Sequence, residues 1–288
     1  MINALVTPFT FSQSNLQNWF ICRRRFLYAD IQHLAYPAPV TQPLQRYEQA
    51  QQRGEIFHQL AHQYALGIPP QALQVPDDEG LQVWWQRFLQ VQDANLLNLP
   101  ARRYPETLLL TPLEEHVLLA KADLIAVEPQ SRFIIADWKS GKPVPSQQLA
   151  THIQTRVYRY VAVLAGSVYN DGEAVHPDQV EMIYWFAQAP EKSVRLPYSV
   201  QQFNDDHQFF LNLIHDIQQE QTFPTVFEDE KERVCRFCVY RNRCWQEVKA
   251  GELADDQDFS LDLELSWGGD DLNADAGGLT TQALESEF

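Results

Sequence analysis

The stretch LLAKADLIAVEPQSRFIIADWKSGKP, residues 118–143, decides the fold of this chain. Its two runs of Leu, Ile, Val and Phe are separated by a polar segment of turn length, a pattern that predicts two successive β-strands. Asp123 lies in the first run, and Asp137 and Lys139 end the second. If the two strands pair as an antiparallel hairpin, two carboxylates and one ammonium group come close together.

Hydrophobic periodicity predicts the elements around this hairpin. Helical spacing predicts helices, and short apolar runs predict strands. The order of these elements indicates an α/β or α+β sandwich. We expect helices at 12–28, 47–64, 80–97, 145–166 and 199–219, and strands at 107–112, 116–127, 131–138, 181–187 and 193–198.

The formal charge of -16 is unevenly distributed. After Lys249 there are 11 acidic residues and no basic ones, which leaves 22 basic against 27 acidic residues in the body. Such a body can carry a local basic groove, so net charge does not exclude nucleic acid. We expect one domain over 1–250 and an acidic, disordered tail over 251–288. Within the tail, apolar residues alternate with polar ones from Phe259 to Trp267, which suggests a strand that docks on a sheet edge or a protein partner.

The first residues lack a basic segment, and the chain has no run of about 18 apolar residues, so neither a signal peptide nor a membrane span is expected. We therefore expect a soluble, cytoplasmic protein with no membrane partner. Three of the four cysteines, Cys235, Cys238 and Cys244, fall within ten residues, and Cys22 stands alone. In a chain without a secretion signal, this clustering indicates metal binding before disulfides.

The acidic residues of the hairpin suit phosphodiester hydrolysis. That reaction uses a divalent cation to activate water, and Mg²⁺ prefers hard oxygen ligands. Asp123, Asp137 and the carbonyl of Trp138 fit the ligand role, Lys139 can stabilise developing charge, and His58 adds a nitrogen that Mn²⁺ tolerates. An isolated D-x-K triplet is more often a strand-end turn with a surface ion pair, so the triplet alone decides little.

Further motifs accompany the triplet in a fixed order. Gly54 and His58 form G-x-x-x-H, Asp123 and the D-x-K triplet follow, and Gln154 and Tyr158 form Q-x-x-x-Y. This ordered set resembles the RecB-like branch of the PD-(D/E)xK nucleases over residues 11–245. Ala122 precedes Asp123 where the superfamily name has proline, a departure that is usual in this branch.

The resemblance assigns roles to these residues. It implies an α/β fold with a restriction-endonuclease-like core, a central mixed sheet flanked by helices. In this core His58, Asp123, Asp137 and the Trp138 backbone are expected to bind Mg²⁺ or Mn²⁺. It also implies that Lys139 is catalytic and that Gln154 and Tyr158 position the DNA and the catalytic groups. Two further residues stay open. Glu106 fits either an approach to the metal or a turn, and His62 fits a packed or exposed histidine better than a zinc ligand.

The cysteine segments, around Cys22 and over CRFCVYRNRC (235–244), resemble those of AddB-type nucleases and CRISPR-associated RecB-like exonucleases. The resemblance implies a [4Fe–4S] cluster on Cys22, Cys235, Cys238 and Cys244, in a helical annex that closes the domain. Zinc with four thiolates is the competitor, because the spacing alone does not distinguish the two metals. Arginines flank these cysteines and suit either phosphate contact or compensation of cluster charge: Arg23, Arg24, Arg25, Arg233, Arg236, Arg241 and Arg243.

These observations predict a metal-dependent DNA nuclease, an exonuclease acting on single-stranded DNA or DNA ends. One alternative is a non-catalytic DNA-binding or scaffold subunit of a DNA repair or CRISPR adaptation complex. Another is a zinc-stabilised adaptor that acts through its acidic tail. The presence of every catalytic position argues for the enzyme.

Overall fold

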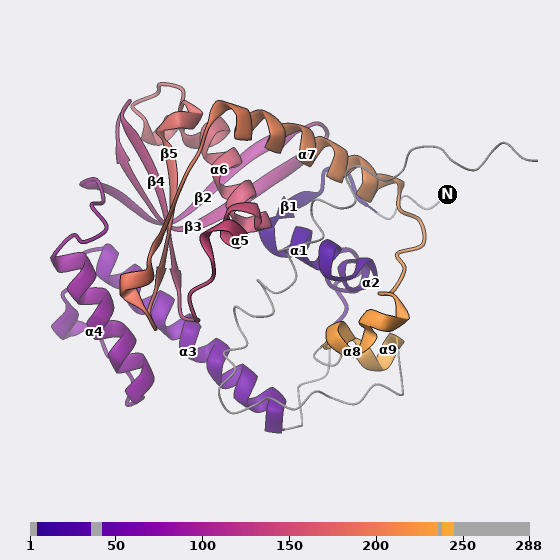
Figure 1. Cartoon of the computed structure of the whole chain (residues 1–288), viewed down its shortest axis with the longest axis horizontal. Helices are drawn as coiled ribbons and strands as arrows, with labels where there is room; N and C mark the ends of the chain where they lie inside the picture. The colour runs from indigo at the N-terminus through magenta and orange to yellow at the C-terminus, as the bar shows by residue number, and fades with distance from the viewer. Residues whose placement is uncertain (1–4, 36–41, 236–237, 245–288) are drawn as a thin grey trace, which may run out of the picture.

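The computed structural model describes residues 5–35, 42–235 and 238–244, and the side chains of these residues except 42–50. A sheet lies between two layers of helices (Figure 1). Its strands are β1 (Thr10–Ser12), β2 (Arg102–Leu113), β3 (His116–Glu128), β4 (Arg132–Lys139), β5 (Val180–Phe186) and β6 (Val194–Pro197). The expected mixed α/β architecture is therefore confirmed.

Strand β3 is the centre of the sheet. It pairs with β2 in antiparallel fashion along nearly its whole length. Its other edge is shared, because residues 117–119 pair in parallel with β1 and residues 124–128 pair in antiparallel fashion with β4. Beyond β4 come the parallel β5 and the antiparallel β6. Between the β1 and β4 segments, residues 120–123 of β3 therefore have an edge that no strand of the described residues covers.

The helices are α1 (Gln13–Ile21), α2 (Arg23–Phe26), α3 (Gln42–Ala65), α4 (Glu79–Asp93), α5 (Ser146–Thr151), α6 (Ile153–Ala165), α7 (Val200–Gln219), α8 (Lys231–Val234) and α9 (Arg241–Cys244). In Figure 1, α3 and α4 lie on one side of the sheet, and α1, α6 and α7 lie on the other. No helix in the described ranges is long and apolar enough to cross a membrane.

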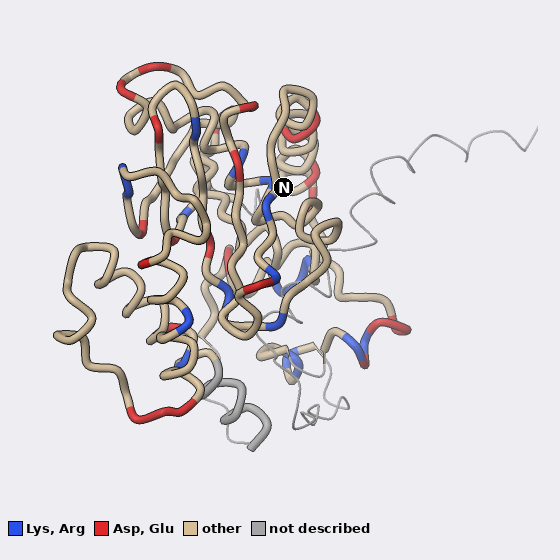
Figure 2. Tube along the Cα trace, turned by 60° about the vertical axis from the view of Figure 1, so that its left-hand side comes forward, with Lys and Arg blue, Asp and Glu red and all other residues tan. Residues whose placement is uncertain are grey.

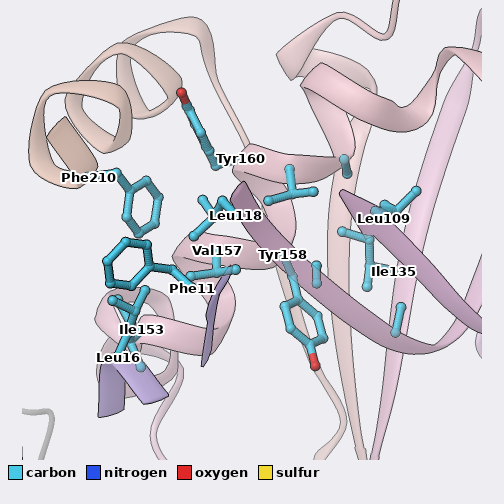
Figure 3. Close-up of a cluster of buried hydrophobic side chains, with 14 of the residues drawn as sticks. Phe11, Leu16, Leu109, Leu118, Ile135, Ile153, Val157, Tyr158, Tyr160 and Phe210 are labelled. Carbon is cyan, nitrogen blue, oxygen red and sulfur yellow. The ribbon is translucent and has the colours of Figure 1, made fainter. Parts of the chain in front are cut away.

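Two hydrophobic cores, one on each face, hold these layers together. On the first face, Leu16 of α1, Val157 of α6 and Phe210 of α7 belong to one cluster with sheet residues such as Leu118 and Ile135 (Figure 3). On the second face, α3 and α4 pack aromatic side chains against the sheet. This cluster includes Phe57, Trp85, Phe88, Leu124, Ile134, Trp138 and Trp185.

Several boundaries differ from the expected ones for local reasons. The helix expected over 12–28 divides at Cys22, whose extended backbone (φ -168°, ψ 115°) ends α1 and begins α2. The helix expected over 145–166 divides at His152, whose imidazole accepts the Gln154 N–H as an N-cap. The helix expected over 80–97 ends at Asp93, because Asn95 adopts a left-handed backbone (φ 45°) and its side chain bonds to Leu99.

Candidate active site

The site lies where β3 and β4 diverge. Their pairing runs from Glu128 opposite Arg132 to Leu124 opposite Ala136 and stops before Asp123. There the Asp123 carboxylate takes the place of a strand partner, because its Oδ2 accepts the Trp138 N–H at 2.8 Å. The N–H and C=O of one residue in a strand leave toward the same edge, so the Trp138 carbonyl also faces this fork.

A backbone distortion brings a third carboxylate to the fork. Glu106 of β2 lies between the pairs Pro105–Leu124 and Thr107–Ala122, directly across from Asp123. Its φ of 48° is left-handed, a conformation that costs a non-glycine residue on the order of 1–3 kcal/mol. The side chains of β3 change face at the same place. Before Asp123 the even-numbered Ala120 and Ala122 belong to the first core, and after it the odd-numbered Ile125 and Val127 do. At this change of face, Asp123 and Glu106 belong to neither core.

His58, Glu106 and Asp123 form a candidate metal centre. One ligand atom from each residue lies within 4.8 Å of the other two, and His58 Nδ1 is 3.2 Å from Asp123 Oδ1. Two carboxylates suit Mg²⁺ or Mn²⁺, and the imidazole favours the softer Mn²⁺. The buried Asp137 Oδ1 accepts no hydrogen bond of regular geometry within the described structure, and its cationic neighbour is Lys139 Nζ at 2.9 Å. The ligand atoms of His58, Glu106 and Asp123, and the Asp137 Oδ1 atom, all fit the coordination of a divalent cation.

Helix α6 supplies the groups that hold Asp137 and Lys139 in place. Gln154 is buried and bridges them, because its Nε2 donates to Asp137 Oδ2 at 2.8 Å and its Oε1 accepts from Lys139 Nζ at 2.9 Å. One turn later, the Tyr158 hydroxyl donates to the Lys121 carbonyl at 2.6 Å. In Figure 3 this hydroxyl points away from the hydrophobic cluster that surrounds the ring. Tyr158 thereby bonds to β3 in the stretch between the β1 and β4 pairings.

The electrostatics of the two aspartates differ. Burial favours the neutral form of Asp123, but the charged His58 and the Trp138 N–H outweigh it and hold the pKa of Asp123 below its ordinary value. Burial raises the pKa of Asp137, against the opposing Lys139 ammonium and with further help from the Asp123 carboxylate. Burial lowers the pKa of His58, but the adjacent Asp123 raises it more, to about 9. Burial also raises the pKa of Tyr158, so its hydroxyl remains a donor. A divalent cation would relieve the repulsion between the carboxylates.

The structure brings all the sequence-predicted residues of this site into one cleft of about 580 Å³. The cleft is lined by His58, Asp123, Asp137, Trp138, Lys139, Gln154 and Tyr158. Glu106 also lines it and was left open by the sequence. No sequence motif points to its neighbour Lys121, whose Nζ lies 2.5 Å from Glu106 Oε2. His62 lines the cleft but is not part of the group with His58.

A second, smaller cavity collects the four cysteines. Cys22, Cys235, Cys238 and Cys244 all line it, together with Arg25 and Arg241. Burial raises the pKa of Cys238, and burial together with the neighbouring thiols raises that of Cys244. The topology thus brings Cys22 to cysteines more than two hundred residues away.

A mixed sheet that forks at an aspartate, with an acid-x-Lys strand end opposite it, defines a nuclease of the PD-(D/E)xK class. In agreement with this class, the model of the PD-(D/E)XK nuclease superfamily matches residues 10–245. The chain therefore belongs to this superfamily. No curated protein matches the sequence.

Two solved structures are similar to this chain over most of their length. The crystal structure of SSO0001 is 12% identical with a TM-score of 0.39, and the match covers 85% of this chain and 90% of that one. A "Putative exonuclease" from Eubacterium rectale is 7% identical with a TM-score of 0.46, and the match covers 84% and 90% of the two chains.

Proposed function

We propose that this chain is a divalent-metal-dependent DNA nuclease of the RecB-like branch, acting in the cytoplasm as an exonuclease on single-stranded DNA or DNA ends. The observation that carries the proposal is the fork of β3 and β4. There Asp123, Asp137 and Lys139 meet Glu106 and His58 in a single open cleft.

Each side chain has a definable task in this reaction. His58, Glu106, Asp123 and Asp137, with the Trp138 carbonyl, would hold Mg²⁺ or Mn²⁺. A bound divalent ion supplies an activated water and neutralises charge on the phosphate. Lys139 places an ammonium beside Asp137, where it stabilises the negative charge that develops on the phosphoryl oxygens. Gln154 fixes the positions of the Asp137 and Lys139 side chains relative to each other through its two hydrogen bonds.

End-labelled single-stranded and double-stranded DNA, incubated with anaerobically purified protein in Mg²⁺, Mn²⁺ or EDTA, tests this proposal. We expect cleavage that requires the metal and is lost in Lys139→Ala, with shortening from labelled ends if the action is exonucleolytic. Lys142→Ala, a change of the same kind at an exposed position after the strand, serves as the matched control. Equal activity of Lys139→Ala and wild type would refute the assignment.

We further propose that the four cysteines hold a [4Fe–4S] cluster. Their common cavity supports a shared metal centre. The choice of a cluster over a single zinc ion rests on the resemblance of the two cysteine segments, because four thiolates can bind either. Iron, sulfide and zinc analysis of anaerobically purified protein tests this proposal. Four irons with sulfide per chain are expected. One zinc and no iron per chain would contradict the cluster and indicate a zinc site.

Residues 1–250 are proposed to form the nuclease unit, and the acidic segment 251–288 to bind a protein partner. The alternating run Phe259–Trp267 lies outside the described residues, so this part rests on sequence alone. Truncation after Ala250 is expected to leave cleavage intact while partner capture is lost. An unchanged set of co-purifying proteins would dismiss the role of the tail.

A further inference from the structure

A further cavity, of about 300 Å³ and distinct from the cysteine cavity, opens beside the catalytic cleft. Trp138 lines both, so the two are neighbours across the residue that separates Asp137 from Lys139. The end of α3 and the loop through Gly67 and Pro70 form one wall, and the opposite wall comes from β2 and β3 at Arg103 and Leu124. The conserved chemistry of phosphodiester cleavage does not require this cavity, since the reacting groups all lie in the cleft.

The walls of the cavity suit a flat aromatic ring. Tyr64 supplies partly exposed aromatic surface, and the buried rings of Phe88 and Trp138 close the inner end of the cavity. The small side chain of the exposed Ala65 leaves room beside Tyr64. Aromatic side chains of this kind stack with nucleobases in proteins that bind single strands, largely without regard to sequence.

A polar group in the cavity lacks a partner. Gln92 is 9% exposed, and its Oε1 accepts from Arg103 Nη1 at 3.3 Å. Its Nε2 is buried with no hydrogen-bond partner within the described structure. Arg103 is itself fixed by bonds to the Pro100 carbonyl and the Asn95 side chain. A buried donor without an acceptor destabilises a fold, so an acceptor atom on a ligand would supply the hydrogen bond that Gln92 Nε2 lacks.

We propose that this cavity receives the nucleobase of the nucleotide next to the scissile phosphate. The base stacks on Tyr64, next to the buried Phe88 and Trp138, and a carbonyl oxygen or ring nitrogen of the base accepts from Gln92 Nε2. A splayed base of this kind is available only in single-stranded or frayed DNA, because a paired base cannot leave the duplex without unstacking. The inference rests on the proposed nuclease function and gives it a physical basis for single-strand preference.

An abasic scan tests the inference. Single-stranded substrates carry one abasic site at successive positions around a defined cleavage point. We expect wild type to cleave roughly tenfold or more slowly when the missing base is the one next to the scissile bond, and to be little affected elsewhere. Equal rates at all positions would overturn the inference.

A cavity-filling variant supplies the second arm. Ala65 is exposed at the cavity mouth, so Ala65→Trp blocks it without disturbing the core. The variant is expected to cleave intact DNA about tenfold more slowly and to lose the position-dependent effect, while hydrolysis of bis(p-nitrophenyl) phosphate, which has no base, is unchanged. Ala174→Trp, at an exposed loop residue, controls for the added indole. Retention of the abasic effect in Ala65→Trp would overturn the inference.

A binding measurement separates this inference from the nuclease proposal. Oligonucleotides with 2-aminopurine at single positions are titrated in Ca²⁺, and one position is expected to show strong quenching that Ala65→Trp abolishes. If wild type cleaves no DNA in Mg²⁺ or Mn²⁺ yet shows this quenching, the nuclease proposal fails and the base cavity stands. If cleavage occurs without any position of distinct quenching, the cavity fails and the nuclease stands.

Discussion

At the scale of single residues, Gln154 illustrates how the site is held together. Its amide contacts Asp137 with the nitrogen and Lys139 with the oxygen, so one neutral side chain orients both charged groups. Residues that orient metal ligands typically contribute about 10–100-fold to activity or metal affinity. Their removal therefore acts through geometry and not through loss of a reacting group.

Gln154→Leu is expected to lower kcat by about 10–100-fold, because the leucine keeps the volume but releases Asp137 and Lys139. Steady-state cleavage rates, measured with Mn²⁺ titrations, check this. Gln147→Leu makes the same change at an exposed position of α5 and should be neutral. If Gln154→Leu retains wild-type kcat and metal affinity, the bridge has no role in the reaction.

The sequence was informative at residues whose chemistry is specific. Asp123 lies within one apolar run and Asp137 and Lys139 end the next, so pairing of the two strands predicts that the three residues lie close together. Glu106 was left open because the preceding residues, with Pro105 and two arginines, lack the apolar pattern of a strand. In the structure β2 begins at Arg102, and the left-handed φ of Glu106 has no signature in the amino-acid sequence.

At the scale of elements, close approach constrains the end of α6. A Cβ added to Gly166 would lie 2.9 Å from Phe133 Cε2 and 2.9 Å from Val175 Cγ2. Phe133 is buried in β4, so neither neighbour can move into solvent. Gly166 is needed here for space, since its φ of -78° is accessible to any residue.

Gly166→Ala is expected to lower the free energy of unfolding by about 1–3 kcal/mol, the usual effect of overfilling a packed core. Urea denaturation followed by circular dichroism measures the change. Gly54→Ala is the matched control, because its Cβ would meet Ser140 Oγ at 3.4 Å and alanine favours the helix interior. An unaltered denaturation midpoint for Gly166→Ala would show that α6 shifts readily.

The segment after α7 is joined to the first helices by Glu220. Its Oε1 accepts from Thr222 N and Thr222 Oγ1 and from Phe223 N, and its Oε2 pairs with Arg23 at 2.8 Å. Burial raises the pKa of Glu220, but these donors outweigh burial and lower it to about 2. A carboxyl with a lowered folded-state pKa stabilises the fold above its unfolded pKa, and this stabilisation is lost as the pH falls toward the folded value.

Glu220→Gln should therefore reduce stability by about 1 kcal/mol at pH 7. The difference from wild type should shrink as the pH falls from about 4.5 to about 2, because wild-type Glu220 becomes protonated over that range. Thermal unfolding of both proteins across this pH range is the measurement. A difference that stays constant down to pH 2 would mean that the charge of Glu220 does not contribute.

Element existence was easier to predict than element boundaries. Long apolar stripes marked the region of α6 and the length of α7, but β1 has three residues and no readable alternation. The division at Cys22 arises from a tertiary demand, because the extended backbone there lies beside the cysteine cavity. Propensity carries no information about such a demand.

At the scale of the whole molecule, the large sheet domain differs from the small segment that carries the distal cysteines. Figure 2 shows Lys and Arg positions on several separate elements among the acidic ones. The sheet and its two cores are large, whereas α8 and α9 have four residues each, and a small core of Ile21, Val234 and Cys235 lies at α8. Helices of that length are not stable alone, so the proposed cluster on the cysteines would contribute to their order. The sequence points to the meeting of Cys22 with these cysteines because Cys22 is the one cysteine left to complete a four-thiolate set, although no local pattern encodes the contact.

If the cysteines hold the proposed metal centre, its removal should loosen one corner and not the whole fold. In Cys22→Ser, we expect residues 225–244 to become sensitive to trypsin and fast in hydrogen exchange, while β3, β4 and β5 keep their protection, because metal binding is coupled to folding of the segment that supplies the ligands. Asp137→Ala is the contrasting control, since it damages the cleft and should leave the cysteine segment protected. Global loss of protection in Cys22→Ser would instead make the centre a condition for folding of the sheet, and unchanged protection with metal absent would mean that the small core suffices to hold the segment.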